Sequence, residues 1–524
     1  MKRSSYMQKL LKNLKGEKEG QKKDSNSSSK QTFSTNLNDN EKAIRELLGY
    51  SQDVQFTKFK IQLNKEKHLE AMVVAIDGLV DEEAKRNNIL KPLLEPSYED
   101  NESEDLQTIQ SRLSVKQADM EENIEKALKQ LLKAQALLLV DGFPKGLLIS
   151  IEGFEIRAID EPETEKAVRG PREGFIESMS VNLTLIRRKI SHPSLRFETL
   201  KIGKYSQTGI TIAYVKDIAK PELVNQIKER LQQIKIDMLE SSGEIEQLIE
   251  DHPYSIFPTV GNTERPDKAA SMLMEGRVCI LIDGQPVSLF VPYLFVESIK
   301  NIEDYSSRPY YASLVRLLRF LAFIISITFP ALYISAVNFN KSLIPSDMVV
   351  PITVARETVP FPLALEVIIM ILMFEVIREA GIRLPEQVGT AISIVGPLIL
   401  GEVAVASAIV GAPTVIIVSI SYIAAFVTTP IADVTALLRI ALFVAASIFG
   451  SYGLVVALLA TFTHMVSLTS FGVPYMAPFS PLHFRDWKDA FVRFPTKLLK
   501  NRPESIPNQR SKKVTSVPDT EGKQ

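Results

Sequence analysis

The side chains most able to do chemistry in this sequence are charges inside an apolar stretch. Residues 363 to 381, LALEVIIMILMFEVIREAG, carry Glu366, Glu375, Arg378 and Glu379. An ionised side chain at the centre of a membrane helix costs about 2.5 to 3.5 kcal/mol, so such residues usually face water, a partner or a neighbouring subunit. Glu402 is similarly isolated in LILGEVAVA.

Helical spacing divides these charges into two groups. Glu366 and Glu375 are nine residues apart, which is about half a turn out of phase at 3.6 residues per turn. Glu375, Arg378 and Glu379 share a face, and we interpret them as an interfacial charge cluster that reaches headgroups or water at the end of a span. For Glu366 and Glu402 two interpretations stay open. Each lines a water-filled path or an intersubunit contact, or each is a neutralised buried glutamic acid.

Catalytic, cofactor and metal sites are not expected. The sequence has no Gly-rich phosphate loop, no His-Glu-x-x-His motif and one cysteine, Cys279, which we expect in a buried strand. Asp141 and Asp283 each precede a glycine between apolar runs, which is the chemistry of a tight turn. With 61 Lys+Arg against 62 Asp+Glu the chain is nearly neutral, which gives no support to nucleic-acid binding. We therefore expect a protein that is not an enzyme and binds no cofactor.

The elements that must position these charges change in character along the chain. Residues 1 to 312 mix charged and apolar residues, 314 to 470 contain long apolar runs, and 483 to 524 are polar and basic. The N-terminus lacks the apolar core of a secretory signal, so we expect the front of the chain in the cytoplasm. The predicted fold class is an α+β or α/β soluble region of two similar tandem subdomains, followed by an all-α polytopic membrane domain.

An internal repeat predicts the tandem subdomains. FTKFKI at 56 to 61 returns as FETLKI at 197 to 202, and KALKQLLKAQALLLVDGFP at 126 to 144 matches KAASMLMEGRVCILIDGQP at 268 to 286. Matches that keep their order at an offset of about 140 residues indicate a duplication. Each copy is predicted as two strands, two helices and a hairpin.

The predicted domain boundaries follow from these patterns. They are a disordered basic and polar tail over 1–45, a first α/β subdomain over 46–160, a second over 161–300, a helical membrane domain over 301–475 and a basic cytoplasmic tail over 476–524.

The membrane domain is predicted to contain five apolar elements. They lie near 317–337, 360–377, 388–410, 413–429 and 434–468, and the second is short or re-entrant. Gly411 and Pro413 mark a break between two helices, and Gly450 and Gly453 a hinge in the last run. Lys and Arg residues flank both ends, so both termini are expected in the cytoplasm with an even number of crossings.

Four long blocks carry a resemblance to a known family. They are GPREGFIESMSVNLTLIRRKI at 170–190, YSSRPYYASLVRLLRFLAF at 305–323, VARETVPFPLALEVIIMILMFEVIREAGIRLPEQVG at 354–389 and AISIVGPLILGEVAVASAIV at 391–410. These blocks resemble the A-subunit family of bacterial spore germinant receptors, over about residues 45 to 495.

The resemblance implies a receptor subunit in the inner membrane of a dormant spore. It implies a transporter-like B subunit that binds the nutrient germinant, a lipoprotein C subunit, and A subunits that form a homo-oligomeric, nutrient-gated cation channel in membrane lipid. In that arrangement a ring of glutamates around a shared axis would favour cations, with Glu366 the first candidate and Glu402 the second.

Two other classes compete with a channel. Broken helices and intramembrane acids also serve secondary transporters, which predict a pseudo-symmetric repeat within 314 to 470. The repeat found in this sequence lies in the soluble half instead. A non-conducting membrane scaffold of the receptor is the third class.

Overall fold

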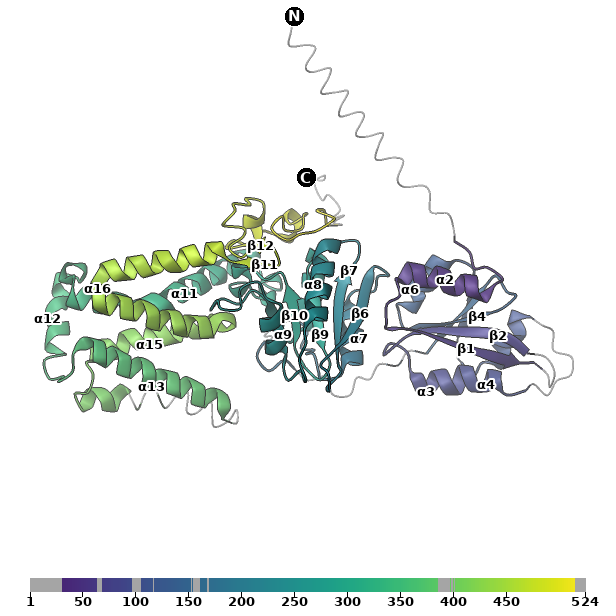
Figure 1. Ribbon diagram of the computed structural model, residues 1–524, viewed down its shortest axis with the longest axis horizontal. Coiled ribbons are helices and arrows are strands. Elements are labelled where there is room, and N and C mark those ends of the chain that lie inside the picture. Colours follow the sequence, from purple (N-terminus) through teal and green to yellow (C-terminus); the bar gives the residue numbers. More distant parts are fainter. Residues whose placement is uncertain are drawn as a thin grey trace, which may run out of the picture.

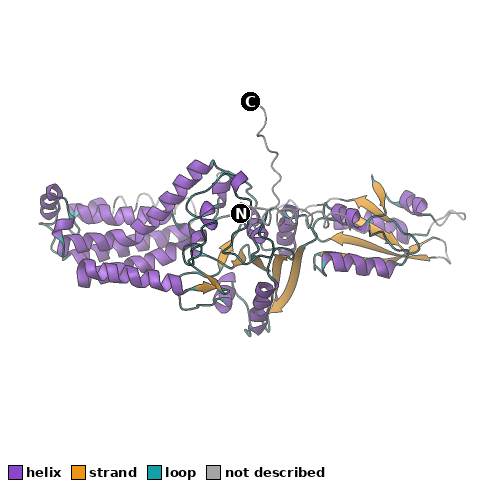
Figure 2. Cartoon of the chain, turned by 90° about the horizontal axis from the view of Figure 1, so that it is seen from above, coloured by secondary structure: helices purple, strands orange, loops and turns teal. Residues whose placement is uncertain are grey.

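The computed structural model describes residues 31–63, 68–96, 105–115, 117–151, 153, 161–166, 169–384, 396, 399 and 401–513. Three parts follow one another along the long axis (Figure 1): a first α/β subdomain, a second α/β subdomain in the middle, and a group of long helices. Seen from above, the sheets occupy one half of the molecule and the long helices the other (Figure 2). The fold is therefore mixed α/β at the front and helical at the back.

The first subdomain is built on a five-stranded antiparallel sheet in the order β1-β2-β4-β5-β3. Its strands are β1 (Val54–Gln62), β2 (His68–Ile76), β3 (Ala118–Glu121), β4 (Gln135–Val140) and β5 (Gly146–Ser150). Its helical segments are α2 (Leu37–Leu48), α3 (Glu82–Ala84), the π-helical η1 (Lys85–Leu90), α4 (Lys91–Leu94), α5 (Leu106–Arg112) and α6 (Ile124–Leu131). Alternate residues of the central strands enter two separate apolar cores, one on each face of the sheet.

The second subdomain repeats this topology. Its sheet has the order β6-β7-β9-β10-β8. The strands are β6 (Leu195–Ile202), β7 (Thr208–Val215), β8 (Gly261–Thr263), β9 (Val278–Ile282) and β10 (Ser288–Val291), and the helices are α7 (Met179–Lys189), α8 (Pro221–Gln233), α9 (Ser242–Ile249) and α10 (Pro266–Glu275). The internal repeat of the sequence thus has a structural counterpart.

The two predicted Asp-Gly turns are present, whereas one short strand in each subdomain was not predicted. Gly142 and Gly284 have φ values of 90° and 79° at the predicted Asp-Gly turns. Cys279 is fully buried in β9, as predicted. The short strands β3 and β8 were not predicted, because three or four residues give too little alternation to be recognised as a strand.

The helical half consists of α11 (Pro309–Asn338), α12 (Ser346–Val354), α13 (Leu363–Arg383), α15 (Ala412–Phe426) and α16 (Ala432–Ser467). Among the described residues, α11 and α16 are long and apolar enough to cross a membrane, by length and composition. Gly411 caps α15 as the predicted break requires, and α16 bends at Gly450, whose φ is 62° and ψ −143°. In the span predicted over 388–410, residues 388–395, 397, 398 and 400 lie outside the described residues, and the number of crossings stays a prediction.

Short segments lie between and after these elements. They are the 3-10 helices η2 (Phe295–Ser298), η3 (Ile302–Tyr305), η4 (Lys341–Leu343), η5 (Thr429–Ile431), η6 (Asp486–Asp489) and η7 (Thr496–Leu498), and the paired strands β11 (Thr469–Ser470) and β12 (Val473–Pro474).

Two predicted boundaries need correction. The N-terminal tail does not extend to residue 45, because α2 begins at Leu37 with Asn36 as its cap and buries Ile44 and Leu48 in the first core. Residues 1–30 of that predicted tail lie outside the described residues. The region 476–513, predicted as part of a basic tail, folds back onto the second subdomain, where Asn508 forms a β-bridge with Ala219.

Candidate functional site

Glu366 lies in the first turn of α13 and is completely buried. Its Oε1 accepts hydrogen bonds from Arg356 Nε at 3.2 Å and Nη2 at 3.0 Å. Its Oε2 accepts from the Gly411 backbone N–H at 3.0 Å and from Thr414 Oγ1 at 3.1 Å. Both oxygens of the carboxylate are therefore satisfied by the same chain.

This arrangement follows from where the helices begin. Gly411 caps the N-terminus of α15, where backbone N–H groups lack intrahelical acceptors and the helix dipole favours a negative charge. A Cβ at Gly411 would lie 3.0 Å from Arg356 Cγ, so the glycine permits the close approach. Glu366 is buried, as one of the two interpretations of the sequence expects, and a place on an ion path stays a prediction. Arg356 was not predicted as its partner because it lies ten residues earlier, in the turn after α12 (Ser346–Val354).

Glu375 and Arg378 pair with each other on α13, and Tyr422 of α15 donates to Glu375 Oε2 at 3.0 Å. The guanidinium of Arg439 lies 3.9 Å from the centroid of the Tyr422 ring, and its Nε donates to the Ser326 carbonyl at 2.9 Å. Arg439 is buried in α16 and was not singled out from the sequence. These contacts tie α13, α15, α16 and α11 together.

Glu379 pairs with a residue outside its predicted cluster. Its Oε1 lies 2.6 Å from Arg383 Nε, and both side chains are exposed. Glu379 thus differs from Glu375, which also contacts a neighbouring helix. The headgroup position predicted for all three charges stays a prediction.

Glu402 presents the opposite situation to Glu366. Its side chain is exposed and makes no hydrogen bond or ion pair within the described part of the chain. Val403 and Val405 beside it are also exposed. Of the two isolated glutamates, Glu402 is therefore the one without a partner among the residues that the structure describes.

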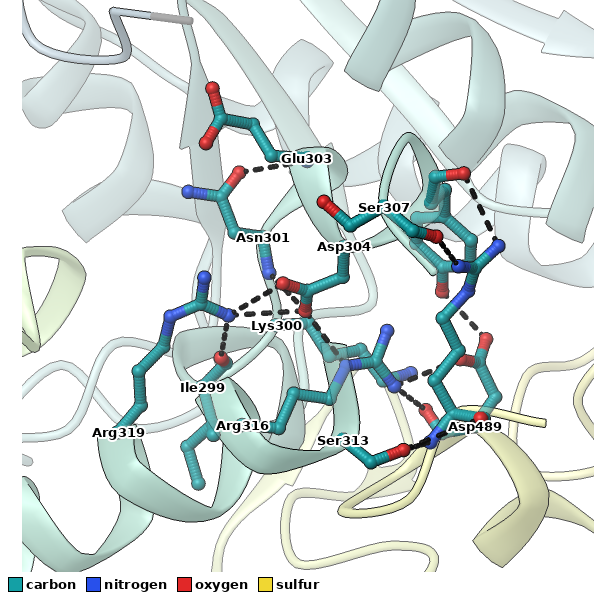
Figure 3. Close-up of polar contacts among 12 residues, drawn as sticks. Ile299, Lys300, Asn301, Glu303, Asp304, Ser307, Ser313, Arg316, Arg319 and Asp489 are labelled. Carbon is teal, nitrogen blue, oxygen red and sulfur yellow. Dashed lines mark hydrogen bonds and ion pairs between the residues drawn. The ribbon is translucent and has the colours of Figure 1, made fainter. Parts of the chain in front are cut away.

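A second charged cluster lies where α11 meets the second subdomain and the C-terminal region (Figure 3). Arg316 of α11 is fully buried, and its Nε donates to Asp304 Oδ2 at 2.7 Å while its Nη1 donates to Asp489 Oδ1 at 2.9 Å. Arg319 Nη1 reaches Asp304 Oδ1 at 2.9 Å. From the sequence, Arg316 and Arg319 were interpreted as topology signals, because their partners lie in other segments. We call Asp304, Arg316, Arg319 and Asp489 the junction cluster.

Two more buried ion pairs lie in the front half. Arg187 of α7 bonds Asp53 of the first subdomain, with Nη2 and Oδ2 2.7 Å apart and both side chains almost inaccessible. Arg277 bonds Glu297 within the second subdomain, with Nη2 and Oε1 2.7 Å apart. Burial alone would raise the pKa of Glu297, but the charges of Arg277 and Lys300 outweigh it and lower that pKa to about 2.

These sites can be compared with known proteins. Residues 42–505 match the family model of the Bacillus/Clostridium GerA spore germination protein. The chain belongs to this family.

Individual relatives support the same assignment. The chain is 39% identical over 461 residues to spore germination protein KA of Bacillus subtilis (strain 168), covering 88% of this chain and 84% of the relative. It is 38% identical over 470 residues to spore germination protein GerLA of Bacillus cereus, covering 89% and 94%. A crystal structure of the N-terminal domain of the A subunit of the Bacillus megaterium spore germinant receptor GerK3 is 34% identical, with a TM-score of 0.41 over 51% of this chain and 98% of that one.

The geometry of these charged sites in the GerA-family chain suits a role in holding its helices in fixed positions. Among the described residues, no group of three or more His, Cys, Asp or Glu side chains could hold a metal ion. The buried carboxylates accept from guanidinium, hydroxyl and backbone N–H donors, and such charge-assisted bonds hold helices in fixed positions. Within the described ranges, the carboxylate of Glu402 has no partner, whereas that of Glu366 has four donors.

Proposed function

We propose that this GerA-family protein is the membrane subunit of a nutrient germinant receptor that triggers spore germination, and that its copies assemble around a cation-conducting path. A transporter-like B subunit binding the nutrient and a lipoprotein C subunit complete the receptor in the spore inner membrane. Both termini face the spore core. The subunit is not an enzyme and needs no cofactor.

The observation that carries the channel proposal is Glu402, which has no partner among the described residues and lies on an exposed, apolar stretch. Ile399, Val403 and Ile409 are exposed near it in the part of the chain that the structure describes, which favours a surface that meets lipid or another copy. An ionised carboxylate facing hydrocarbon is unfavourable by about 2.5 to 3.5 kcal/mol, which favours a position at a contact between copies or on a wet path. A ring of such carboxylates attracts cations.

Glu366 takes a different part in the proposal. Its carboxylate clamps α13 to the N-terminus of α15 and to Arg356, so it stabilises one arrangement of these helices. A pore-lining role for Glu366 would require that clamp to open. We therefore place Glu402 before Glu366 as the residue nearest the ion path, which reverses the order expected from the sequence.

Gating requires a link between the nutrient-binding partner and the helices. One continuous apolar core runs from the sheet of the second subdomain to α11, α13, α15 and α16, and the junction cluster lies at the same border. Movement of the second subdomain would shift the helices, and a ligand acts by favouring one of the two arrangements.

Ion flux tests the proposal. The chain, co-reconstituted in liposomes with its B and C subunits, should pass monovalent cations when the nutrient is added, in large unitary currents. Saturable exchange would instead indicate a secondary transporter, and absence of flux a scaffold; either result contradicts the channel. Glu402→Gln should reduce cation selectivity, whereas Glu379→Gln, which removes an exposed charge paired with Arg383, serves as the matched control.

A further inference from the structure

The region after α16 packs along the start of α11. We call residues 478–500 the collar. The Arg493 backbone N–H donates to Ser313 Oγ at 3.0 Å, and the rings of Phe491 and Phe320 are 4.7 Å apart. These contacts cover about two turns of α11, or roughly 10 Å at 1.5 Å per residue. The collar therefore lies beside the first turns of the helix (Figure 1).

At this level α11 already presents apolar side chains outward. The exposed residues are Tyr310, Tyr311, Leu314, Leu317, Leu318 and Leu321. α11 has the length and hydropathy of a membrane span, and in a bilayer this exposed face of its first turns would meet lipid. Tyrosines at the start of a span are typical of the membrane–water interface. The collar thus lies at the depth where α11 enters the bilayer.

The outer surface of the collar is apolar and aromatic. Leu482, Phe484 and Trp487 are 59%, 71% and 42% exposed, and Val492 and Leu498 are exposed as well. The Trp487 ring lies 5.7 Å from Phe484 and 5.9 Å from Phe479, so the aromatic residues form one cluster. Such a patch on a soluble surface marks an interaction site.

The acidic side chains and the lysines of the collar differ in whether they have partners within the described part of the chain. Asp486 accepts from the Ser505 backbone N–H at 2.8 Å, and Asp489 belongs to the junction cluster, so both acids are engaged within the chain. Lys488, Lys497 and Lys500 are exposed and form no ion pair among the described residues. Exposed lysines beside apolar side chains fit a surface of anionic headgroups.

We propose that the collar is a membrane-interface element, whose apolar side chains enter the headgroup region of the leaflet where α11 begins and whose lysines contact anionic phospholipid. The collar packs against α11 through Phe491 and Arg493, on a helix whose first turns expose apolar side chains, and this favours lipid over a protein partner. The collar thereby fixes the junction cluster at the membrane surface.

The sequence supplies a reporter for this proposal, because Trp487 is the only tryptophan in the chain. The full chain is reconstituted in vesicles of phosphatidylcholine and phosphatidylglycerol, and flotation verifies insertion. We expect Trp487 emission to lie at short wavelength, to lose most of its intensity with nitroxide lipids labelled near the headgroup, to lose less with labels deep in the acyl chain, and to resist iodide.

A matched control moves the reporter. In a Trp487→Phe/Tyr205→Trp variant the tryptophan replaces an exposed residue of the second subdomain between β6 and β7. Its emission should be quenched by iodide and unaffected by nitroxide lipids. In a Lys488→Glu/Lys497→Glu/Lys500→Glu variant, lipid quenching in the anionic vesicles should fall to the level found in pure phosphatidylcholine.

Three results would overturn the proposal. Trp487 quenched by iodide but not by lipid labels in floated protein would place the collar in water. Protection from both quenchers would mean that protein, such as a second copy, covers it. If the protein fails to float, it is not inserted in the vesicles, and the membrane depth assigned to α11 and to the collar is wrong.

Discussion

The two α/β subdomains share one topology but differ in what covers their sheets. Each face of the first sheet is covered by residues of its own subdomain. In the second, one face has a core closed mainly by its own residues, while the other continues into the helical half, where Phe295 packs against Phe323 of α11 with ring centroids 5.6 Å apart. Duplication therefore produced one peripheral copy and one copy integrated with the helices.

The borders of the two copies differ in the same way. Arg187 and Asp53 connect the first copy to the second, with Ser51 accepting from Arg187 Nη2 at 3.3 Å. The junction cluster and a continuous apolar core connect the second copy to the helices. A change at the second border should reach the helices, and a change at the first should remain local.

The largest effect is expected from Arg316→Ala. It leaves the buried Asp304 with Arg319 alone and removes the arginine that bonds Asp489, and breaking a buried pair costs about 3 to 5 kcal/mol. Thermal unfolding of the detergent-purified chain should start well below that of the wild type, with the second subdomain and the helices losing structure together. Arg308→Ala removes an exposed arginine nearby and should be neutral. Equal effects of the two variants would show that the junction cluster does not hold this border.

Arg187→Met should loosen the contact between the first and the second copy without unfolding either copy. It leaves the Asp53 carboxylate buried and unpaired, at a cost of about 3 kcal/mol, but each sheet keeps its own core. Limited proteolysis should cut faster between residues 151 and 175, and nutrient-triggered ion flux should persist.

The rescue variant Arg187→Met/Asp53→Leu removes both charges and should recover much of the lost resistance to protease. If the single variant unfolds the second subdomain as well, the first copy is not peripheral.

Acid should affect the second copy more than the first. The pKa of Glu297 is lowered to about 2 from its ordinary value of 4.5, so its stabilising effect is present above about pH 4.5 and is lost as the pH falls toward 2. Glu297→Gln should be less stable than wild type at pH 7 and show a flatter pH profile between 4.5 and 2, measured by intrinsic fluorescence during denaturation. In the first copy the repeat places Gln135 where the second has Arg277. Glu121→Gln changes a half-buried carboxylate of the first copy that accepts from the backbone N–H groups of Glu122 and Asn123 and has no arginine partner among the described residues, so it should flatten the profile less than Glu297→Gln.

The sequence predicted local features better than distant pairs. The repeat, the Asp-Gly turns and the break at Gly411 depend on neighbouring residues, and each has a structural counterpart. The partners of Glu366 and Arg316 lie 10 to 173 residues away in sequence, and no periodicity reports such pairing. Sequence spacing identified which charges are isolated on their own helix. It did not show which of them another helix would neutralise.

The smallest effect is expected from substitutions in one turn that occurs at matching positions of the two copies. Ala134 and Gly276 occupy matching positions of the repeat after α6 and α10, with φ values of 69° and 105°. Since a non-glycine residue pays roughly 1 to 2 kcal/mol in this region, Ala134→Gly should stabilise the first copy by about 1 kcal/mol, after the entropy of glycine in the unfolded chain is counted.

Gly276→Ala should destabilise the second copy by more than Ala134→Gly stabilises the first. Besides the backbone strain, its Cβ would lie 3.0 Å from Pro507 O and from Asn508 Cβ, in the segment that folds back on this subdomain. Denaturant unfolding followed by hydrogen exchange in each subdomain measures both changes. The repeat contains no residues that match Pro507 and Asn508 in the first copy. If the two substitutions changed stability by equal and opposite amounts, the segment around Pro507 would not constrain the second copy.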